Sequence, residues 1–284
     1  MSGLIALSAG GWKAGVLPNS GGLLTSLSRE GTDILRPMPA ESHDPLQSAC
    51  FPLVPYTNRI ADARFAWQGE DVQLPRNFAP ESSSIHGMGW QSEWRVSHQH
   101  EFKCTLEHEW DAAEGWPWGY AAQQRIRLGK KGLAITLNAT NRSARAMPMG
   151  LGLHPYFRRR PETKLTFSAT GAVATGDAQI PDGNIIAPDH FADFAGGAVL
   201  PETLVDHCFV GWDGTVRIED DLGAITLSAT GAPFLHVYVP ADGTTLCLEP
   251  VSHKPDALNQ DPAGMTLLPP GCSASLQMWI SAEG

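Results

Sequence analysis

The feature that most constrains this chain is a two-residue apolar period that recurs in short segments along its length. In residues 133–140, Leu, Ile, Leu and Ala alternate with Ala, Thr, Asn and Thr, which gives a strand one apolar face. Turn-forming sequences such as Ala-Asp-Gly at 241–243 separate such segments. The same pattern predicts further strands at residues 164–168, 225–230, 234–239, 244–249 and 275–281.

Glycine and proline, 29 and 22 of the 284 residues, are scattered along the chain and do not cluster in linkers. Charged residues make up 18% of the chain, below the roughly 25% of an average domain. Long amphipathic helices need more charge and fewer helix breakers, so we expect no helix longer than a turn or two. Many short strands separated by turns predict an all-β sandwich or barrel.

Charge and cysteine content narrow the partners and the compartment. The chain has 30 acidic and 20 basic residues, a net charge of −10, which argues against binding nucleic acid or an anionic membrane surface. Its five cysteines are widely spaced and form no CxxC pair, so we expect free thiols in a reducing cytoplasm. We find no signal-peptide pattern and no apolar run long enough to span a bilayer. These observations favour a small-molecule partner.

Two loop-like segments place reactive groups beside stiff or small neighbours. A proline-rich apolar stretch leads to Asn58 and Arg59, which offer an amide and a guanidinium group with five donors. An arginine that pairs with an acid at a strand end explains the same residues without a ligand. His86 lies beside glycines and near Trp90, where a ligand could approach the backbone closely. A loop histidine with a structural hydrogen bond is the alternative there.

Three further segments place ionisable groups beside apolar neighbours. His154 follows an apolar run, and Pro155 restricts its backbone to an extended conformation. Because a buried imidazole without a partner is costly, His154 must contact another polar group. Glu249 ends a very apolar strand and is either paired or held as a base with a raised pKa. Asp206 is a weaker candidate, shortly before an aromatic residue.

These segments together resemble the aldose 1-epimerase family, also called galactose mutarotases, over about residues 10–280. The resemblance implies a large antiparallel β-sandwich of the galactose mutarotase type, in a single domain over residues 1–284. The motifs that carry it, in family order, are NRI at 58–60, IHG at 85–87, LHPYF at 153–157, VDHCF at 205–209 and LEPVSHKPDALN at 248–259.

The resemblance also implies a reaction and the residues that perform it. A base removes the proton of the anomeric hydroxyl while an acid protonates the ring oxygen, and the opened sugar recloses as the other anomer. No cofactor or metal is implied, the partner is a free monosaccharide, and the protein is expected to be a monomer or homodimer. The implied roles are general base for Glu249, general acid for His154, a second histidine near the ring oxygen for His86, and sugar-hydroxyl contacts for Asn58, Arg59 and Asp206. A carboxylate near His154 could keep it protonated, and Asp206 is the candidate.

Two departures from the galactose-specific pattern point to a divergent bacterial branch of the family. Arg158, Arg159 and Arg160 follow the LHPYF motif where galactose-specific members have Asn-Leu. Val251 stands where those members place a glutamine. The three arginines suit a phosphorylated hexose, because guanidinium groups bind phosphate bidentately. A solvated loop charge run in an acidic protein is the alternative that we favour.

Other readings of the same residues stay open at this point. His98 and His100 alternate on one strand face, as in cupin-like metal sites, but Glu107 follows too late, so we favour half-buried strand histidines. Asp206 and Glu249 could serve as the two carboxylates of a glycoside hydrolase, which would leave the histidines unused. A catalytically silent sugar-binding or regulatory module on the same sandwich is a further possibility. The nine tryptophans suit sugar stacking or core packing.

Overall fold

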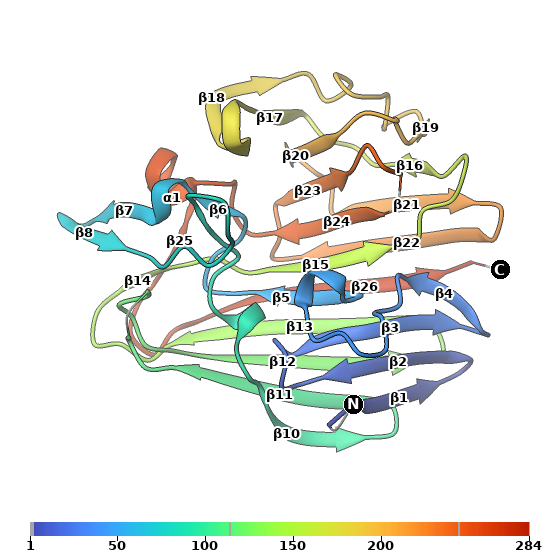
Figure 1. The fold of residues 1–284 in the computed structure, drawn as a ribbon, viewed down its shortest axis with the longest axis horizontal. Coiled ribbons are helices and arrows are strands. Elements are labelled where there is room, and N and C mark those ends of the chain that lie inside the picture. Colours follow the sequence, from blue (N-terminus) through green and yellow to red (C-terminus); the bar gives the residue numbers. More distant parts are fainter. Residues whose placement is uncertain (1–2, 114, 244, 284) are drawn as a thin grey trace.

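The computed structural model describes residues 3–113, 115–243 and 245–283. Within these residues the strands form an eleven-stranded and a nine-stranded antiparallel sheet, which lie against each other as two layers (Figure 1). Side chains of both sheets share one large apolar core, which includes Leu137 from one sheet and Leu153 from the other. The predicted all-β antiparallel sandwich is therefore confirmed, and the barrel alternative is wrong.

The eleven-stranded sheet carries three of the five motifs, LHPYF on β15, VDHCF on β20 and the start of LEPVSHKPDALN on β24. Its strands pair as antiparallel neighbours, and β5 lies beside β15 and β3. In spatial order they are β1 (Ile5–Ala9), β2 (Trp12–Leu17), β3 (Leu23–Arg29), β4 (Thr32–Leu35), β15 (Gly152–Phe157), β24 (Leu246–Val251), β23 (Phe234–Val239), β20 (Val205–Val210), β17 (Gly171–Thr175) and β18 (Pro181–Ile186), with β5 at Cys50–Leu53.

The nine-stranded sheet forms the second layer and contains no motif residue named above. Its strands in spatial order are β10 (Arg95–His100), β11 (Lys103–Trp110), β12 (Tyr120–Gly129), β13 (Gly132–Asn141), β26 (Ser273–Ala282), β22 (Gly223–Thr230), β21 (Thr215–Asp220), β16 (Lys164–Thr166) and β19 (Ala198–Val199).

Three two-stranded sheets and six short helical turns complete the described chain. The single α-helix is one turn long, as expected, and no helix in the described residues is long and apolar enough to cross a membrane. The small sheets pair β6 (Arg59–Ile60) with β9 (Ser84–Ile85), β7 (Arg64–Trp67) with β8 (Glu70–Gln73), and β14 (Met147–Met149) with β25 (Thr266–Leu268). The helical turns are α1 (Ala257–Gln260), η1 (Pro45–Gln47), η2 (Ala61–Ala63), η3 (Gly89–Gln91), η4 (Asp177–Gln179) and η5 (Pro262–Gly264).

The period-two segments are strands, with one correction. β13, β22, β23 and β26 cover the predicted segments closely, and β16 covers only the first three residues of the segment at 164–168. β24 covers the segment at 244–249 except Thr244, which lies outside the described residues, and Thr245. The alternating stretch at residues 94–110 is two strands, β10 and β11, because the chain turns at residues 101–102. β10 is an edge strand whose six residues are all exposed, so His98 and His100 are not half-buried as predicted.

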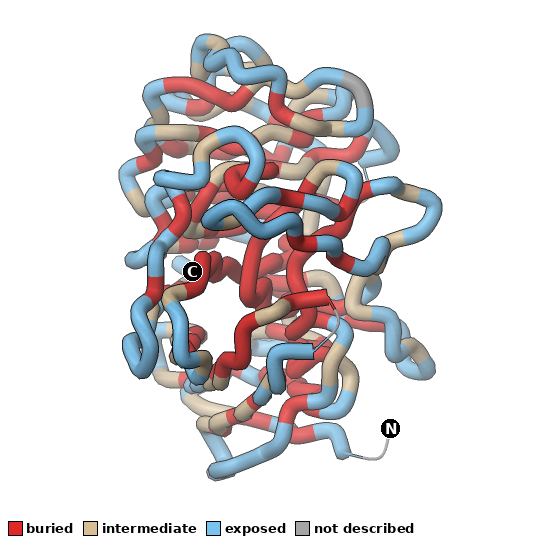
Figure 2. Tube along the Cα trace, turned by 90° about the vertical axis from the view of Figure 1, so that its left-hand side faces the viewer, coloured by how far each residue is buried: buried red, intermediate tan, exposed pale blue. Residues whose placement is uncertain are grey.

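Alternation in the eleven-stranded sheet separates the core from a second buried face. In β15, Leu153 and Phe157 point into the core between the sheets, whereas Tyr156 belongs to a smaller apolar cluster on the opposite face. Figure 2 shows the buried segments gathered in the interior of the molecule, with exposed residues mainly along its outline. Because loops cover the second face, these strands are buried on both sides, and the site is built on that face.

Candidate active site

Strand register places a row of side chains across the second face of the eleven-stranded sheet. Phe51 of β5 pairs with His154 of β15, and His236 of β23 pairs with Glu249 of β24. The register of β15 with β24 sets His154 opposite Glu249, because the flanking pairs are Gly152 with Val251 and Tyr156 with Cys247. Partners in an antiparallel pair point to the same face, so these side chains are neighbours by construction.

His154 and Glu249 form a buried acid–base pair at the centre of this row. The Nε2 atom of His154 lies 3.2 Å from Oε1 of Glu249, and the residues are 7% and 2% exposed. The His154 ring stacks on both Phe51 and Tyr156, with both centroid distances 4.6 Å, and these two rings also contact each other at 6.2 Å. This aromatic cluster limits how the imidazole can turn, so Nε2 is held toward the carboxylate. Oε2 of Glu249 has no hydrogen-bond partner among the described residues.

Burial moves the pKa values of the pair in opposite directions. It raises the pKa of Glu249 to about 7, although the charges of His236 and Arg59 work against this rise. Burial, helped by the charge of His236, lowers the pKa of His154 to about 3. Between these two values the pair holds one proton, which resides on Glu249 and can pass to His154 across a single hydrogen bond.

We had expected Asp206 to lie near His154, but it pairs with another histidine instead. Its Oδ1 lies 2.7 Å from Nε2 of His236, and both residues are buried. Burial opposes a charge on His236, but the hydrogen bond with Asp206 and the charges of Glu249 and Asp206 outweigh it and raise the pKa of His236 to about 10. The imidazolium of the site at neutral pH is therefore His236.

Two loop residues with left-handed backbone conformations hold each other over the sheet. Asn58 has φ 54° and His86 has φ 61°. The backbone N–H of His86 donates to the carbonyl of Asn58 at 3.0 Å, and the backbone N–H of Asn58 donates to Nδ1 of His86 at 3.2 Å. Burial lowers the pKa of His86 well below its usual value. Neutral His86 therefore carries its proton on Nε2 and can donate from that atom.

Arg59 is held in a fixed orientation by two acids. Its Nε and NH2 atoms donate to the two carboxylate oxygens of Glu81 at 2.8 and 2.9 Å, a bidentate pair. Its NH1 lies 3.7 Å from Oδ2 of Asp206. The structural interpretation of Arg59 as a partner of an acid is thus correct, and the residue still lines the cleft.

The C-terminal motif supports the loop that carries Asn58 and Arg59. Nε2 of His253 accepts a hydrogen bond from the backbone N–H of Thr57 at 3.0 Å. Asp256 accepts one from the backbone N–H of Ala61 at 3.0 Å, and its own N–H donates to the carbonyl of Arg59. The SHKPDALN segment therefore positions the NRI segment from beneath, which the sequence did not predict.

The side chains on the second face of the sheet and the loop above it line a cleft of about 550 Å³, a size typical of small-molecule sites. The structure brings all six predicted site residues together there: Glu249, His154, His86, Asn58, Arg59 and Asp206. His236 and Glu81 also line it and were not predicted. A signal for His236 was present, since it is the one polar residue in the apolar segment Phe234–Val239, on the strand before Glu249.

Comparison with known proteins gives relatives over almost the whole chain. The sequence model of the family described as aldose 1-epimerase matches residues 4–281. The chain belongs to the aldose 1-epimerase family. The resemblance that the five motifs carried is thereby confirmed.

Individual relatives extend the similarity to whole chains and whole structures. The uncharacterized protein YphB of Escherichia coli strain K12 is 32% identical over 293 residues, with 99% of both chains covered. A solved structure from Escherichia coli K12, named as a candidate aldose 1-epimerase, has a TM-score of 0.91 at 32% identity and covers 99% of this chain and 98% of that one. A galactose mutarotase-like protein from Clostridium acetobutylicum shares the fold, with a TM-score of 0.85, 21% identity and coverage of 99% and 95%.

The three arginines that distinguish this chain from galactose-specific members of the family are occupied in structural contacts. Arg158 forms a bidentate pair with Asp220, and Arg160 pairs with Asp221. Arg159 donates to two backbone carbonyls. None of the three lines the cleft as described. They tie the end of β15 to neighbouring segments, Arg158 through a largely buried pair and Arg160 through a solvent-exposed one, so they form no phosphate site on the sheet face.

The structure decides between the two alternatives given for the tryptophans at positions 116 and 118. Trp116 and Trp118 are fully buried in the core, and the aromatic residues that line the cleft are Phe78, Tyr156 and Tyr238. The tryptophan pair therefore serves core packing and not sugar stacking.

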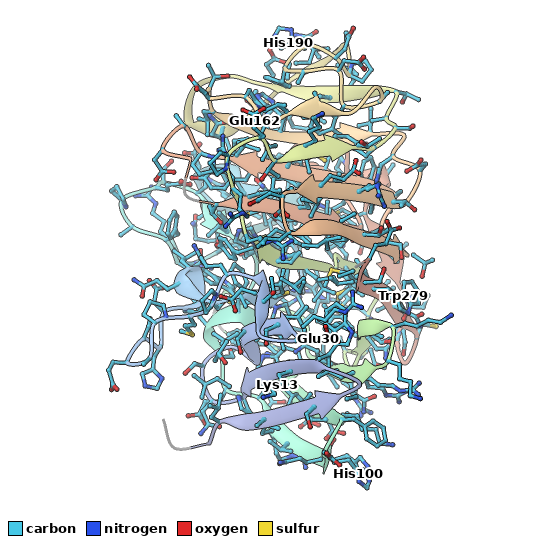
Figure 3. All side chains as sticks on the ribbon, turned by 90° about the vertical axis from the view of Figure 1, so that its right-hand side faces the viewer. Lys13, Glu30, His100, Glu162, His190 and Trp279 are labelled. Carbon is cyan, nitrogen blue, oxygen red and sulfur yellow. The ribbon has the colours of Figure 1, made fainter. Side chains whose placement is uncertain are left out.

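The metal alternative has no support in the described residues, which contain no group of three or more metal-binding side chains. Figure 3 shows His100 at the outer end of the molecule, where its side chain points to solvent. Its ring lies 4.7 Å from that of His98 on the exposed edge strand. Glu107, the third residue of that hypothesis, pairs with Arg95 instead.

Proposed function

We propose that this protein is an aldose 1-epimerase that interconverts the α and β anomers of a free aldose by acid–base ring opening and reclosure. The observation that carries the proposal is the buried pair of His154 and Glu249, 3.2 Å apart in a cleft of monosaccharide scale. Ring opening needs one base and one acid within hydrogen-bond reach of the same anomeric centre. A glycoside hydrolase would need a second catalytic carboxylate, and Asp206 is engaged by His236.

In the proposed reaction Glu249 accepts the proton of the anomeric hydroxyl while His154 gives a proton to the ring oxygen. The bond from C1 to the ring oxygen breaks with its electron pair on that oxygen, and C1 becomes a carbonyl carbon. After rotation about the C1–C2 bond, His154 takes the proton back from the ring-forming hydroxyl. Glu249 returns its proton to the carbonyl oxygen, so the cycle balances in protons and electrons. The reaction starts from the one-proton pair after its proton has passed from Glu249 to His154.

The remaining residues of the cleft suit recognition of sugar hydroxyls. His86 would donate from Nε2 to the ring oxygen or a neighbouring hydroxyl, since its Nδ1 is occupied by the backbone of Asn58. Asn58 and Arg59 would donate to hydroxyl oxygens, and Asp206 would accept through Oδ2. Phe78 and Tyr238 offer apolar surface at the cleft for the faces of the ring.

The proposal includes an unphosphorylated substrate. The net charge of −10 repels a phosphorylated sugar, and the three arginines that could have countered it are held by acids and carbonyls. We further propose that residues 1–284 act as one domain, as a monomer or homodimer. The described cysteines are all free, which supports the cytoplasm as the compartment.

An anomerisation assay tests this function directly. Polarimetry or NMR exchange should be run on hexoses, pentoses, 6-deoxy sugars and 6-phospho sugars, with the spontaneous rate subtracted. We expect acceleration for neutral aldoses, little for the 6-phospho sugars and no effect of EDTA. Binding without acceleration for every sugar would identify a silent sugar-binding module. Faster turnover of a 6-phospho sugar than of neutral aldoses would contradict the substrate assignment. Loss of activity in EDTA would support a metal-dependent reaction instead.

A further inference from the structure

Glu249 lies between two imidazoles that differ in their partners. His154 faces it from β15 on one side, and His236 faces it from β23 on the other. Nε2 of His154 points to Glu249, whereas Nε2 of His236 points to Asp206. The carboxylate at the centre of the site thus has a neutral imidazole on one flank and an ion-paired imidazole on the other.

The ring nitrogens of His236 are not available to a sugar. Nε2 is 2.7 Å from Oδ1 of Asp206. Nδ1 is excluded from solvent, and β20 places Cys208 opposite His236 in the register. Any effect of His236 on the reaction must therefore act through its charge on the neighbouring groups.

We propose that His236 is a positioning residue, whose Asp206-bound imidazolium favours the proton arrangement in which Glu249 is anionic and His154 carries the proton. This inference rests on the proposed epimerase function. Geometry gives the direction of the effect. Glu249 is one strand away from His236 and His154 is two strands away, about 5 and 10 Å at ordinary strand spacing. The attraction to the nearer carboxylate therefore exceeds the repulsion of the farther imidazolium.

The same Nε2 atom of His236 also lies near the side chain of Asn58. The side-chain amide nitrogen of Asn58 lies 3.4 Å from Nε2 of His236, while Oδ1 of Asn58 accepts from the backbone N–H of Arg59. When Nε2 carries a proton for Asp206, it cannot accept a hydrogen bond from Asn58. The amide hydrogens of Asn58 are then free for a substrate hydroxyl.

The other groups around Glu249 do not replace this charge. Buried thiols and phenols nearby have raised pKa values and stay neutral at pH 7. Arg59 also attracts the carboxylate but is itself paired with Glu81. The groups that face Glu249 are Cys50 on β5, Arg59 on β6, His154 and Tyr156 on β15, Asp206 and Cys208 on β20, His236 on β23, Cys247 on its own strand, and His86 above the sheet.

His236→Gln tests the proposal, since glutamine keeps an N–H for Asp206 and removes the charge. In the pH profile of kcat/KM we expect the alkaline limb to move up by about one unit and kcat to fall about tenfold. A lower kcat with an alkaline limb at the wild-type pH would show that His236 has only a structural role, and this would overturn the proposal. A pH profile identical to that of the wild type would also overturn it. His108→Gln, which alters a buried histidine of the other sheet, should leave the limb in place.

NMR titration separates this inference from the epimerase function itself. With ¹³C-labelled glutamate, assigned through Glu249→Gln, the Glu249 carboxyl should titrate at higher pH in His236→Gln than in the wild type. His236 of the wild type should remain an imidazolium at pH 8, a measurement that requires no folded variant. A neutral His236 at pH 8, or an unmoved carboxyl titration, contradicts the proposal. A wild type that accelerates no sugar contradicts only the function.

Discussion

Nε2 of His154 lies 3.2 Å from Oε1 of Glu249, and the two side chains sit on neighbouring strands with almost no solvent contact. Neither group has a second carboxylate or imidazole hydrogen-bonded to it among the described residues. The pair therefore exchanges protons only with itself or with a molecule in the cleft. The first two predictions follow from this isolation.

Glu249→Gln should abolish acceleration of anomerisation, with a loss of at least about 100-fold, because the amide cannot accept the anomeric proton. Glutamine fills the same volume, so the fold should be retained. Polarimetry on the best neutral aldose measures the rate, and Glu202→Gln serves as the control at an exposed glutamate. Near wild-type activity in Glu249→Gln would remove this residue from the role of base.

The rate should decline as the pH rises through about 7. The pKa of Glu249 is about 7 and that of His154 about 3, so the pair holds its one catalytic proton below pH 7 and loses it above. The profile of kcat/KM from pH 4 to 9, corrected for the spontaneous reaction, checks this sign. A rate that instead rises through pH 7 would mean that the acid is a group other than His154.

The sequence was sufficient for the strands and for most of the cleft, for identifiable reasons. Period-two alternation is local, so β13 and β22 were predicted from a few residues each. The six cleft residues came from motifs that the family resemblance joined. Partners such as Glu81 for Arg59 could not be predicted, because they depend on a loop that returns 22 residues later.

The pairing register of the strands explains why the sequence did not predict His236. His236 and Glu249 are 13 residues apart, and only the pairing of β23 with β24 makes them neighbours on one face. The role of Asp206 depended on the same information, since β20 presents it to His236 and not to His154. Exposure of β10 was equally inaccessible, because an alternating segment does not reveal that it ends a sheet.

Arg59→Lys should raise KM for the aldose about tenfold while kcat changes only a few-fold. Lysine cannot form the bidentate contact with Glu81, so its ammonium group would not be held toward the cleft. Initial rates over a range of sugar concentrations separate the two constants. Glu81→Gln, which keeps the guanidinium but weakens its orientation, should give a smaller rise in KM. An unchanged KM in Arg59→Lys would exclude Arg59 from substrate binding.

The protein should lose stability as the pH falls from about 6.5 to 4. Burial lowers the pKa of His253 to about 4, so the unfolded chain binds this proton at a higher pH than the folded one. The stabilisation is present above pH 6.5 and is lost on acidification, by up to about 3 kcal/mol for a shift of this size. His86 and His154 act in the same direction.

Thermal unfolding between pH 7 and 4 measures this loss, and His253→Gln isolates one contribution. Glutamine can accept the Thr57 N–H but does not titrate, so the variant should be less sensitive to acid even if it is less stable at pH 7. An equal pH dependence in the two proteins would contradict the assignment to His253.

Gly87→Ala should destabilise the fold and reduce activity, because Gly87 lies against the loop that supports His86. A Cβ atom at Gly87 would stand 2.3 Å from the carbonyl oxygen of Val54, which already accepts hydrogen bonds from two backbone N–H groups. Gly69→Ala is the matched control, since its φ of +87° is as unfavourable for alanine but no atom lies within 4 Å of the added Cβ.

We expect the control to lose about 1 kcal/mol of unfolding free energy, from the backbone conformation alone. The loss for Gly87→Ala should exceed it by about 1–3 kcal/mol, as for other overpacked sites. Urea unfolding compares the two variants, and equal losses would show that the contact with Val54 relaxes without cost.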